Sequence, residues 1–377
     1  MPRRAVINGA GAPLRFEDFP LQEVKPGYVR VKVEYAGVCH TDLHLRTDET
    51  SMGSGRFHRL RDVVGEEKFN KMVMGHEIAG HIDELGPDQS KNMDFKKGDR
   101  VAVFPWLGCQ ECGTCKAGET NLCDNDPILL YDYGCSPDFP GGYQTHMIAE
   151  VRHLVKVPDN VSLDIASMLA CSGGTSYSAA SKLKEAVEFG AKTNASGKAR
   201  IMVIGAGGLG LWAIQLVKVL YPGKVHVVAV DVEQSKIDTA KQYGADEGVI
   251  WSRSASEKEN AAATTKNGKI NGGIDYIGSG VTSSTGFQCL VRNGTLVLVG
   301  LHGGALTVPT AEVVLQQKAT RGSIVFNMQQ FKDLVSLVSA KNISYPCVTY
   351  YKFDQVNEAL DLLEKGKING RAIIKHD

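Results

Sequence analysis

Two patterns of apolar and polar positions divide the chain into an early and a late part. Near the N-terminus, Val29, Val31 and Val33 alternate with charged residues, a period of two that is typical of a half-buried strand. From about residue 162 the pattern changes to stretches of helical periodicity that alternate with short apolar runs. The first part is therefore predicted to be β-rich, and the second to hold buried parallel strands separated by helices.

The late part predicts a regular series of strands and helices. The strands are predicted at 200–204, 226–230, 249–251, 274–277 and 296–299. Helices are predicted directly after the strand at 200–204 and from Lys236 to Gly244, and the chain ends with a helix over 356–363 and a strand over 371–374. Alternating strands and helices favour a doubly wound parallel sheet, the α/β class.

A glycine-rich turn joins the strand at 200–204 to its helix. It reads Gly205-Ala206-Gly207-Gly208-Leu209-Gly210. Gly205 allows a tight turn, Gly207 lets the backbone approach a pyrophosphate, and Gly210 packs the helix on the strand. The free N–H groups at the start of the helix favour an anion there. The segment predicts a dinucleotide site, and an ordinary βα turn is the alternative interpretation.

Asp231 ends the next strand, 21 residues after Gly210. A carboxylate there accepts hydrogen bonds from the ribose hydroxyls of NAD and repels the 2′-phosphate of NADP. Lys236 lies close enough to weaken this discrimination, but NAD remains favoured. Further on, Val299-Gly300-Leu301 follows a strand, and its glycine lets the backbone pass close to a nicotinamide ring.

Four cysteines lie close together in the first part. Cys109, Cys112, Cys115 and Cys123 have the spacing C-x2-C-x2-C-x7-C. Four thiolates are enough to close a tetrahedral zinc with no open position, so this site is predicted to be structural. A zinc ribbon that binds nucleic acid is the alternative, and the balanced charge of the chain argues against it.

Three further residues predict a second, catalytic zinc. Cys39, His76 and Cys171 offer two thiolates and an imidazole, and three protein ligands leave a fourth position for substrate. The two thiolates cancel the charge of the divalent metal, and such a metal lowers the pKa of a hydroxyl that binds it. Each residue alone is more often a buried core residue, so the prediction rests on all three together.

Composition limits the possible partners and the compartment. The chain has 377 residues, which suggests two domains, and its 42 basic residues balance 42 acidic ones. No partner is expected among nucleic acids or membranes, because no basic excess and no long apolar stretch exists. The nine cysteines, four of them crowded at metal-binding spacing, and the absence of a secretory pattern at the start predict a cytoplasmic protein.

These motifs together resemble the zinc-dependent alcohol dehydrogenases of the medium-chain dehydrogenase/reductase superfamily. The matching stretches are GVCHTDLH at 37–44, GHE at 75–77, the cysteines at 109–123, Cys171, and GAGGLG at 205–210. The resemblance covers essentially the whole chain and implies a GroES-like β domain over 1–172, which 322–377 rejoin, and a Rossmann domain over 173–321. It implies oxidation of a primary or secondary alcohol with NAD, two zincs per chain, and a homo-oligomer, either a dimer or a tetramer.

The resemblance also implies roles for single residues. Thr41 would accept the proton of the alcohol and pass it, through ribose hydroxyls of the cofactor, to His44. Asp42 and Glu77 match the carboxylates that surround the catalytic zinc, Glu77 as an occasional ligand. Two residues, His40 and Arg371, match positions that contact the pyrophosphate, and Trp106 lies where the substrate pocket narrows.

One departure and two alternatives remain. The 36 residues between Cys39 and His76 exceed the usual interval, and the polar segment 46–72 either forms a rim over the substrate or is a surface insertion without a role. A zinc-free quinone or enone reductase on the same fold would leave the candidate ligands without a purpose. A non-catalytic dinucleotide-binding protein would bind the cofactor without turning it over.

Overall fold

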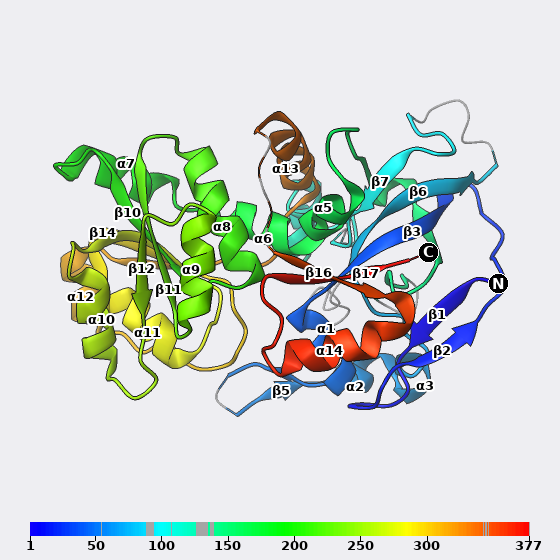
Figure 1. The fold of residues 1–377 in the computed structure, drawn as a ribbon, viewed down its shortest axis with the longest axis horizontal. Coiled ribbons are helices and arrows are strands. Elements are labelled where there is room, and N and C mark those ends of the chain that lie inside the picture. Colours follow the sequence, from blue (N-terminus) through cyan, green and yellow to red (C-terminus); the bar gives the residue numbers. More distant parts are fainter. Residues whose placement is uncertain are drawn as a thin grey trace.

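Two large sheets lie side by side and are joined by helices. The structure is a computed structural model that describes residues 1–53, 55–87, 94–106, 108–125, 135, 139–341, 343, 345 and 347–376. In Figure 1, the sheet with its helices at the left comes from the middle of the chain, while the lobe at the right contains both chain ends. No helix in the described part of the chain combines the length and apolarity that crossing a bilayer requires.

The first lobe is built on a mainly antiparallel sheet of seven strands. Its order is β16-β17-β3-β6-β7-β9, and β8 pairs with β3 beside this path. The strands are β3 (Tyr28–Val38), β6 (Glu77–Leu85), β7 (Arg100–Val103), β8 (His146–Glu150), β9 (Leu154–Lys156), β16 (Val348–Lys352) and β17 (Arg371–Lys375). Since β17 pairs with β3, the last residues of the chain complete a sheet that the first residues begin.

Short elements complete this lobe. They are the hairpin of β1 (Arg3–Val6) and β2 (Arg15–Asp18), α1 (His40–Thr47), β4 (Thr50–Ser51), β5 (Phe57–His58), α2 (Arg61–Val64), α3 (Glu66–Phe69), α4 (Gly113–Lys116), η2 (Thr120–Leu122), η4 (Val151–His153), η6 (Phe353–Gln355) and α14 (Val356–Glu364). Helix α14 packs against α1, so the returning end of the chain supports the helix that follows Cys39.

The second sheet has six strands that are all parallel. Its order is β12-β11-β10-β13-β14-β15. The strands are β10 (Ala199–Ile204), β11 (Val225–Asp231), β12 (Glu247–Ile250), β13 (Ile270–Asp275), β14 (Leu290–Leu298) and β15 (Ala319–Gly322). The strand order reverses between β10 and β13, and ligands of such sheets bind beyond the carboxyl ends of the strands at this point.

Helices cover both faces of the parallel sheet. They are α7 (Lys184–Thr193), α8 (Gly208–Leu220), α9 (Gln234–Gln242), α10 (Glu257–Thr265), α11 (Gly280–Gln288) and α12 (Thr310–Gln316). Helices α7, α8 and α9 share one apolar core with the sheet, and α10 and α11 share the core of the opposite face. The observed fold, a β lobe beside a doubly wound parallel sheet, confirms the predicted α/β fold class.

Two connections join the lobes. One is the helical run of α5 (Leu163–Met168), the π-helical turn η5 (Leu169–Gly173) and α6 (Gly174–Ser181), and α6 packs against α8. The other is the crossover segment 323–327, which leads from β15 to α13 (Met328–Lys341). Helix α13 packs on α6 and η5 (Figure 1). The domain limits at 172/173 and 321/322 stay a prediction; the first falls inside η5 and the second at the end of β15.

The sequence missed part of the parallel sheet. A strand is predicted at 274–277, but β13 covers Ile270–Asp275 and contains Gly272 and Gly273. Both glycines are buried, and a Cβ on Gly272 would press on Leu183, whereas one on Gly273 would press on Leu296. Glycines in a strand suggest a break, and only tertiary packing reveals why they are needed. The sequence pattern also makes no separate prediction for helices α11, α12 and α13.

Candidate metal centres and cofactor groove

Three parts of the first lobe bring two thiols, an imidazole and a carboxylate together. Cys39 lies between β3 and α1, while Cys171 lies in the π-helical turn η5. His76 and Glu77 stand at the start of β6. One ligand atom from each of the four residues lies within 4.8 Å of the others, and all four residues are buried. The structure thus places the three predicted ligands of the catalytic metal in one cluster.

Two local features allow this close approach. Gly37 faces Glu77 in the ladder between β3 and β6, and a Cβ at position 37 would overlap the Glu77 carboxylate. Cys171 sits in a π-helical turn, a rare bulge that proteins often use at functional sites. The glycine of the Gly-Val-Cys motif is therefore explained by a side chain about forty positions away in the sequence, a signal that only pairing of the strands reveals.

The two thiols of this cluster differ in acidity. A hydrogen bond from Cys171 and the positive charge of Arg371 hold the pKa of Cys39 well below its usual range, against the effect of burial. The pKa of Cys171 is raised in turn, because it shares this hydrogen bond with Cys39 and is buried. These surroundings favour the thiolate form of Cys39, and a bound cation would favour loss of the proton from Cys171.

The imidazole of His76 also suits a metal. Burial lowers its pKa, but contacts with Cys135 and Cys39 and the charge of Asp42 raise it well above the ordinary value. Neither ring nitrogen has a hydrogen-bond partner of normal geometry in the described part of the chain. The negative surroundings that favour a proton on this ring favour a metal cation in its place. The donor set and its charge therefore fit Zn²⁺.

Asp42, in the first turn of α1, contacts both the Cys39 segment and the His76 segment of the cluster. Its Oδ2 accepts hydrogen bonds from the Cys39 backbone N–H at 2.8 Å and the Tyr143 hydroxyl at 3.0 Å. Its Oδ1 accepts from the Gly75 N–H at 3.1 Å and lies 3.8 Å from Nδ1 of His76. A carboxylate that faces the outer nitrogen of a metal-binding His orients the ring. Tyr143 was not predicted, since a single Tyr in a glycine-rich loop gives no signal.

Glu77 connects the cluster to the parallel sheet. Arg371 donates from Nε to Oε2 of Glu77 at 3.0 Å and from Nη2 to Oε1, and the Ser172 N–H also donates to Oε1 at 3.3 Å. Nη1 of Arg371 lies 3.6 Å from the place that a Cβ on Gly208 would take, at the start of α8. Arg371 therefore lies between the metal cluster and the glycine turn, and its pairing with Glu77 was not predicted.

Thr41 and His44 lie one turn apart on α1. The Thr41 hydroxyl oxygen is 3.6 Å from the sulfur of Cys39. Nδ1 of His44 lies 3.2 Å from the backbone oxygen of Glu49, and because a carbonyl can only accept, this nitrogen carries the hydrogen. In the neutral ring, Nε2 of His44 is then the nitrogen that can accept a hydrogen bond. The spacing on α1 places both side chains on the same face of the helix.

Trp106 forms a wall of the metal cluster. Its ring centroid lies 5.6 Å from that of His76, and its Nε1 donates to the backbone oxygen of Ala170 at 3.2 Å, next to Cys171. The side chain is almost completely buried. The family resemblance implies that Trp106 lies at a narrow part of the substrate pocket, and the structure adds that it packs on two ligand-bearing segments.

The glycine turn has the geometry that its sequence predicts. Gly205 has a φ of 90°, in the left-handed region, and a Cβ on Gly210 would overlap the backbone oxygen of Gly205. At Gly207, no described heavy atom lies within 4 Å of the place that a Cβ would take, so this side of the turn is open. Gly208 begins α8, and the oxygen of Leu209 accepts a hydrogen bond from the Ser176 hydroxyl. The free N–H groups at the start of α8 remain directed to the open side.

Asp231 lies beside this turn. Its Oδ2 accepts a hydrogen bond from the Ala206 N–H at 2.8 Å, and its Oδ1 accepts from the Val232 N–H at 2.7 Å. The carboxylate is therefore fixed at the carboxyl end of β11, next to the glycine turn. The Glu233 N–H also donates to Oδ1, at 3.2 Å, so Oδ2 with its single backbone bond keeps the larger capacity to accept, which a ribose hydroxyl can use.

Basic and titratable side chains lie near the glycine turn and Asp231. Lys236 pairs with Glu233 at 3.1 Å. Desolvation and the positive charges of Arg371, His44 and Lys236 lower the pKa of His40 from its ordinary value, against the opposite effect of Cys39. Three cationic or titratable groups thus act on His40 at once. Such a cluster at the start of a helix suits an anion.

The strand end at Val299 is held by a neighbouring carbonyl. The N–H groups of Val299 and Gly300 both donate to the backbone oxygen of Asp275 at 3.0 Å. A Cβ on Gly300 would overlap the backbone of Ile277, so only glycine fits there. Leu301, the next residue, is 54% exposed. The Asp275 carboxylate accepts four further hydrogen bonds in this turn, a role that the sequence did not indicate.

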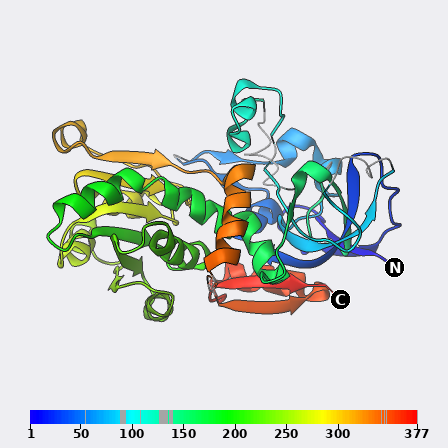
Figure 2. The ribbon, with the colours of Figure 1, turned by 90° about the horizontal axis from the view of Figure 1, so that it is seen from above.

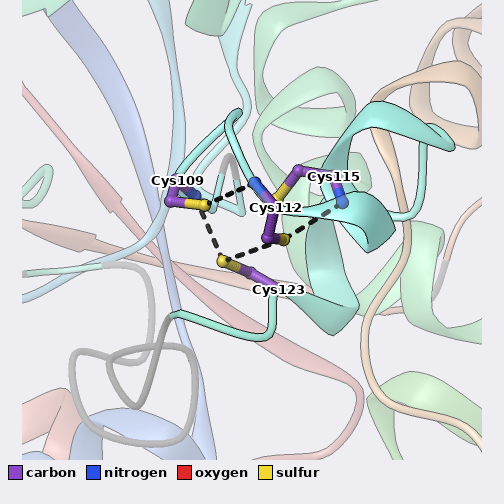
Figure 3. Close-up of side chains that lie close together, drawn as sticks. All are labelled: Cys109, Cys112, Cys115 and Cys123. Carbon is purple, nitrogen blue, oxygen red and sulfur yellow. Dashed lines mark hydrogen bonds between the residues drawn. The ribbon is translucent and has the colours of Figure 1, made fainter.

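The four-cysteine lobe, residues 108–125, forms a second cluster. Ligand atoms of Cys109, Cys112, Cys115 and Cys123 lie within 4.8 Å of one another, and Figure 3 shows the sulfurs turned toward a common centre. Backbone N–H groups donate to these sulfurs, at 3.2 Å from Cys109 to Cys123 and at 3.3 Å from Cys115 to Cys112. All nine cysteines of the chain are free thiols, so no disulfide competes for them.

The backbone donors prepare these thiols for a metal. Bonds from the Glu111 and Cys112 N–H groups lower the pKa of Cys109 to about 6. Burial raises the pKa of Cys115 to about 12, so this thiol loses its proton only when a cation is present. Four sulfurs with preformed N–H donors fit a closed, four-coordinate zinc.

The long segment 46–72 reaches toward the parallel sheet. Within it, β4 and β5 pair as a short hairpin. A Cβ on Gly53 would press on the backbone oxygen of Gly304, and one on Gly303 would overlap the side chain of Ser51. The tip of the hairpin therefore meets the loop after β14, across the space between the two lobes.

Comparisons with known proteins agree with this geometry. Residues 25–159 match the alcohol dehydrogenase GroES-like domain, and residues 208–340 match the zinc-binding dehydrogenase family. An NAD-dependent alcohol dehydrogenase of Sulfolobus acidocaldarius is 34% identical over 374 residues, with 98% of each chain covered. The alcohol dehydrogenase structure from Aeropyrum pernix is 30% identical with a TM-score of 0.79, covering 99% of each chain. The acetophenone reductase of Geotrichum candidum, solved with NAD, is 27% identical with a TM-score of 0.75, covering 99% of this chain and 96% of that one.

Proposed function

The chain belongs to the zinc-dependent alcohol dehydrogenases of the medium-chain dehydrogenase/reductase superfamily, and from this premise we propose that it interconverts a primary or secondary alcohol and the matching aldehyde or ketone with NAD. One observation supports this most strongly. The cluster of Cys39, His76 and Cys171 is linked by the Glu77–Arg371 ion pair to the start of α8, where a pyrophosphate would bind. Metal site and cofactor groove are thereby neighbours.

We further propose two zincs per chain. Cys39, His76 and Cys171 would hold the catalytic ion, with Glu77 beside them, and the four-cysteine lobe would hold the structural ion. The catalytic ion supplies Lewis-acid polarisation of the substrate oxygen, and NAD supplies the hydride acceptor. The protein's own contribution is to position both groups and to move the proton.

Proton movement would begin at Thr41. Its hydroxyl lies beside Cys39, and a hydroxyl can accept one proton while it donates another. His44 holds its hydrogen on Nδ1 by the contact with Glu49, so its Nε2 is available to take up the proton and release it to solvent. Asp42 keeps α1 in register with the metal cluster through its bond to the Cys39 N–H.

The cofactor would lie along the carboxyl ends of the parallel strands. Asp231 would bind the adenosine ribose and disfavour NADP, and Lys236 would lie near the same ribose. His40, Arg371 and the glycine turn of Gly205, Gly207, Gly208, Leu209 and Gly210 would contact the pyrophosphate. Val299, Gly300 and Leu301 would line the nicotinamide.

We propose that the protein is a homo-oligomer of the cytoplasm. Strand β15 is the open edge of the parallel sheet and is exposed along its whole length. Next to it on α12, Val314 and Leu315 are 71% and 77% exposed, and Figure 2 shows this orange strand and helix at the outer edge of the molecule. An open edge with apolar neighbours favours pairing with a second copy. Nine free thiols favour a reducing compartment.

A metal analysis and an absorbance assay test the function. We expect about two zincs per chain and NAD reduction at 340 nm with at least one member of a panel of primary and secondary alcohols. NADP should be the poorer cofactor by the ratio of kcat/KM values. A zinc-free reductase would show no metal in the Cys39 cluster but reduce quinones or enones, and a non-catalytic protein would bind NAD without any turnover.

A further inference from the structure

We propose that Thr120 and Asn121 are positioning residues through which the four-cysteine lobe holds Trp106 and the crossover segment 323–327 in place beside the catalytic metal cluster. Both residues belong to the short turn η2, between Cys115 and Cys123. They are 6% and 7% exposed, whereas the neighbouring Leu122 is 51% exposed. A turn that buries its polar pair and exposes its leucine reverses the usual preference, so the two polar side chains have specific partners inside.

The partner of Thr120 belongs to the catalytic metal cluster. The Thr120 hydroxyl donates to the backbone oxygen of Trp106 at 2.9 Å in a buried position. Trp106 in turn packs beside the His76 ring and donates to the backbone oxygen of Ala170, which precedes Cys171. One hydrogen bond from the lobe therefore fixes the residue that touches two of the three metal-binding segments.

The partner of Asn121 belongs to the crossover between the lobes. Its Nδ2 donates to the backbone oxygen of Ile324 at 3.0 Å, and Nδ2 of Asn327 donates to Glu119 at 3.3 Å. Between them, Val325 has a φ of 31°, an unfavourable value for a β-branched residue, so surrounding contacts must hold it. Phe326 packs on Gly174, and the segment borders the same apolar core as Cys39 and Cys171.

Neither residue is needed to hold a metal in the lobe. The sulfurs receive hydrogen bonds from backbone N–H groups, as from Cys112 and Cys115. Among the described residues, the side chains of Thr120 and Asn121 bond only to partners outside the lobe. The turn itself packs closely against the cysteines, since a Cβ on Gly108 would overlap both the sulfur of Cys115 and the backbone oxygen of Thr120. When the lobe is ordered, these two side chains therefore hold Trp106 and the segment 323–327 in position.

The first test is Thr120→Val, which keeps the shape and removes the hydroxyl. This test rests on the proposed function, because it assumes a catalytic zinc at Cys39, His76 and Cys171. We expect kcat to fall about tenfold with the KM for NAD unchanged, and the buried zinc to pass to a chromogenic chelator about tenfold faster, by analogy with residues that orient metal ligands. Thr120→Ser, which restores the hydroxyl, should recover both values.

The second test is Asn121→Leu. Nδ2 loses its bond to Ile324, but the buried Oδ1, which has no hydrogen-bond partner in the described part of the chain, is removed as well. We therefore expect little change in Tm, faster hydrogen exchange of the amides at 323–327, and a lower kcat. A lower Tm with unchanged kcat and unchanged exchange at 323–327 would indicate a purely structural residue.

Thr114→Val is the matched control. Thr114 lies in the same lobe, and its hydroxyl bonds to Asp124 on the surface rather than to the cleft. The proposal is wrong if Thr120→Val and Thr114→Val change kcat and zinc release equally. If Thr120→Val does not fold, hydrogen exchange of the wild-type protein decides, measured with and without the zinc of the four-cysteine lobe. Removal of that zinc alone must speed exchange of the amides at 169–173 and at 323–327, and unchanged protection of these amides overturns the proposal. A wild-type protein with no metal or no alcohol activity would instead overturn the proposed function.

Discussion

The two cysteine-rich clusters have similar ligands but are built in opposite ways. The four-cysteine lobe takes all its ligands from 109–123, and three of its four cysteines are partly exposed. The catalytic cluster takes its ligands from three distant segments and buries them all. The lobe is a local structure that backbone N–H groups prepare for a metal, whereas the catalytic cluster exists only when the whole first lobe has folded. A cluster built from one segment does not depend on the rest of the fold. A cluster built from three segments is placed by the fold where the substrate and the cofactor can meet.

Removing one ligand from each cluster should separate these roles most clearly. His76→Ala is expected to lower kcat by at least about 10³-fold, since metal polarisation contributes several kcal/mol to the barrier. NAD binding, measured by fluorescence titration, should persist. Cys112→Ala should lower Tm, by roughly 3–4 °C for a loss of about 2–3 kcal/mol in a chain of this length. It should lower kcat only about tenfold, through the loosened contacts of Thr120 and Asn121. Equal effects of the two changes on Tm and kcat would contradict the division of roles.

The proton path belongs to the catalytic cluster alone. Thr41→Ala should lower kcat about 10²-fold, the usual scale of a lost acid–base group, and leave the zinc content at the wild-type level. Thr41→Ser keeps a hydroxyl and should retain much of the activity. Steady-state kinetics with one alcohol over a range of pH measures both variants. If alanine and serine lose activity equally, Thr41 does not carry the proton.

Removal of a single oxygen atom should weaken the contacts that support the catalytic cluster. Tyr143→Phe removes the hydroxyl that donates to Asp42, the carboxylate that faces His76. We expect zinc to leave the catalytic cluster about tenfold faster, while release from the lobe is unchanged. A chelator assay with two resolved phases gives both rates. Tyr28→Phe, a change at a Tyr on β3 away from both clusters, serves as the control.

The smallest effect concerns the acidity of the lobe thiols in the metal-free protein. Because the pKa of Cys109 is lowered to about 6, this cysteine should react with iodoacetamide at pH 7, and its reaction should fade as the pH falls through about 6. Cys115, with its pKa raised to about 12, should stay unreactive over that range. The thiolate of Cys109 therefore favours the folded lobe above pH 6 and loses this contribution in acid. Peptide mapping by mass spectrometry checks both cysteines.

The difference between the clusters also explains what could be predicted. The cysteine spacing at 109–123 and the glycine turn at 205–210 are local patterns, and both have the geometry expected of them. For Cys39, His76 and Cys171, side-chain chemistry alone suggests one site, since the three residues come from distant segments and no local spacing joins them. No local signal pointed to Tyr143, whose partner Asp42 is 101 residues away, or to the Glu77–Arg371 pair, which depends on the pairing of β17 with β3.

The position of β17 has a consequence for the order in which the protein is made. Arg371 is the counter-ion of the buried Glu77, and it is added to the growing chain 294 residues later. Until then the end of β3 at residues 35–38 lacks a neighbour on one side and the carboxylate lacks its charge partner, so the nascent catalytic cluster stays open to water. The four-cysteine lobe can capture its metal before β17 is made, while the catalytic cluster closes only once β17 is in place.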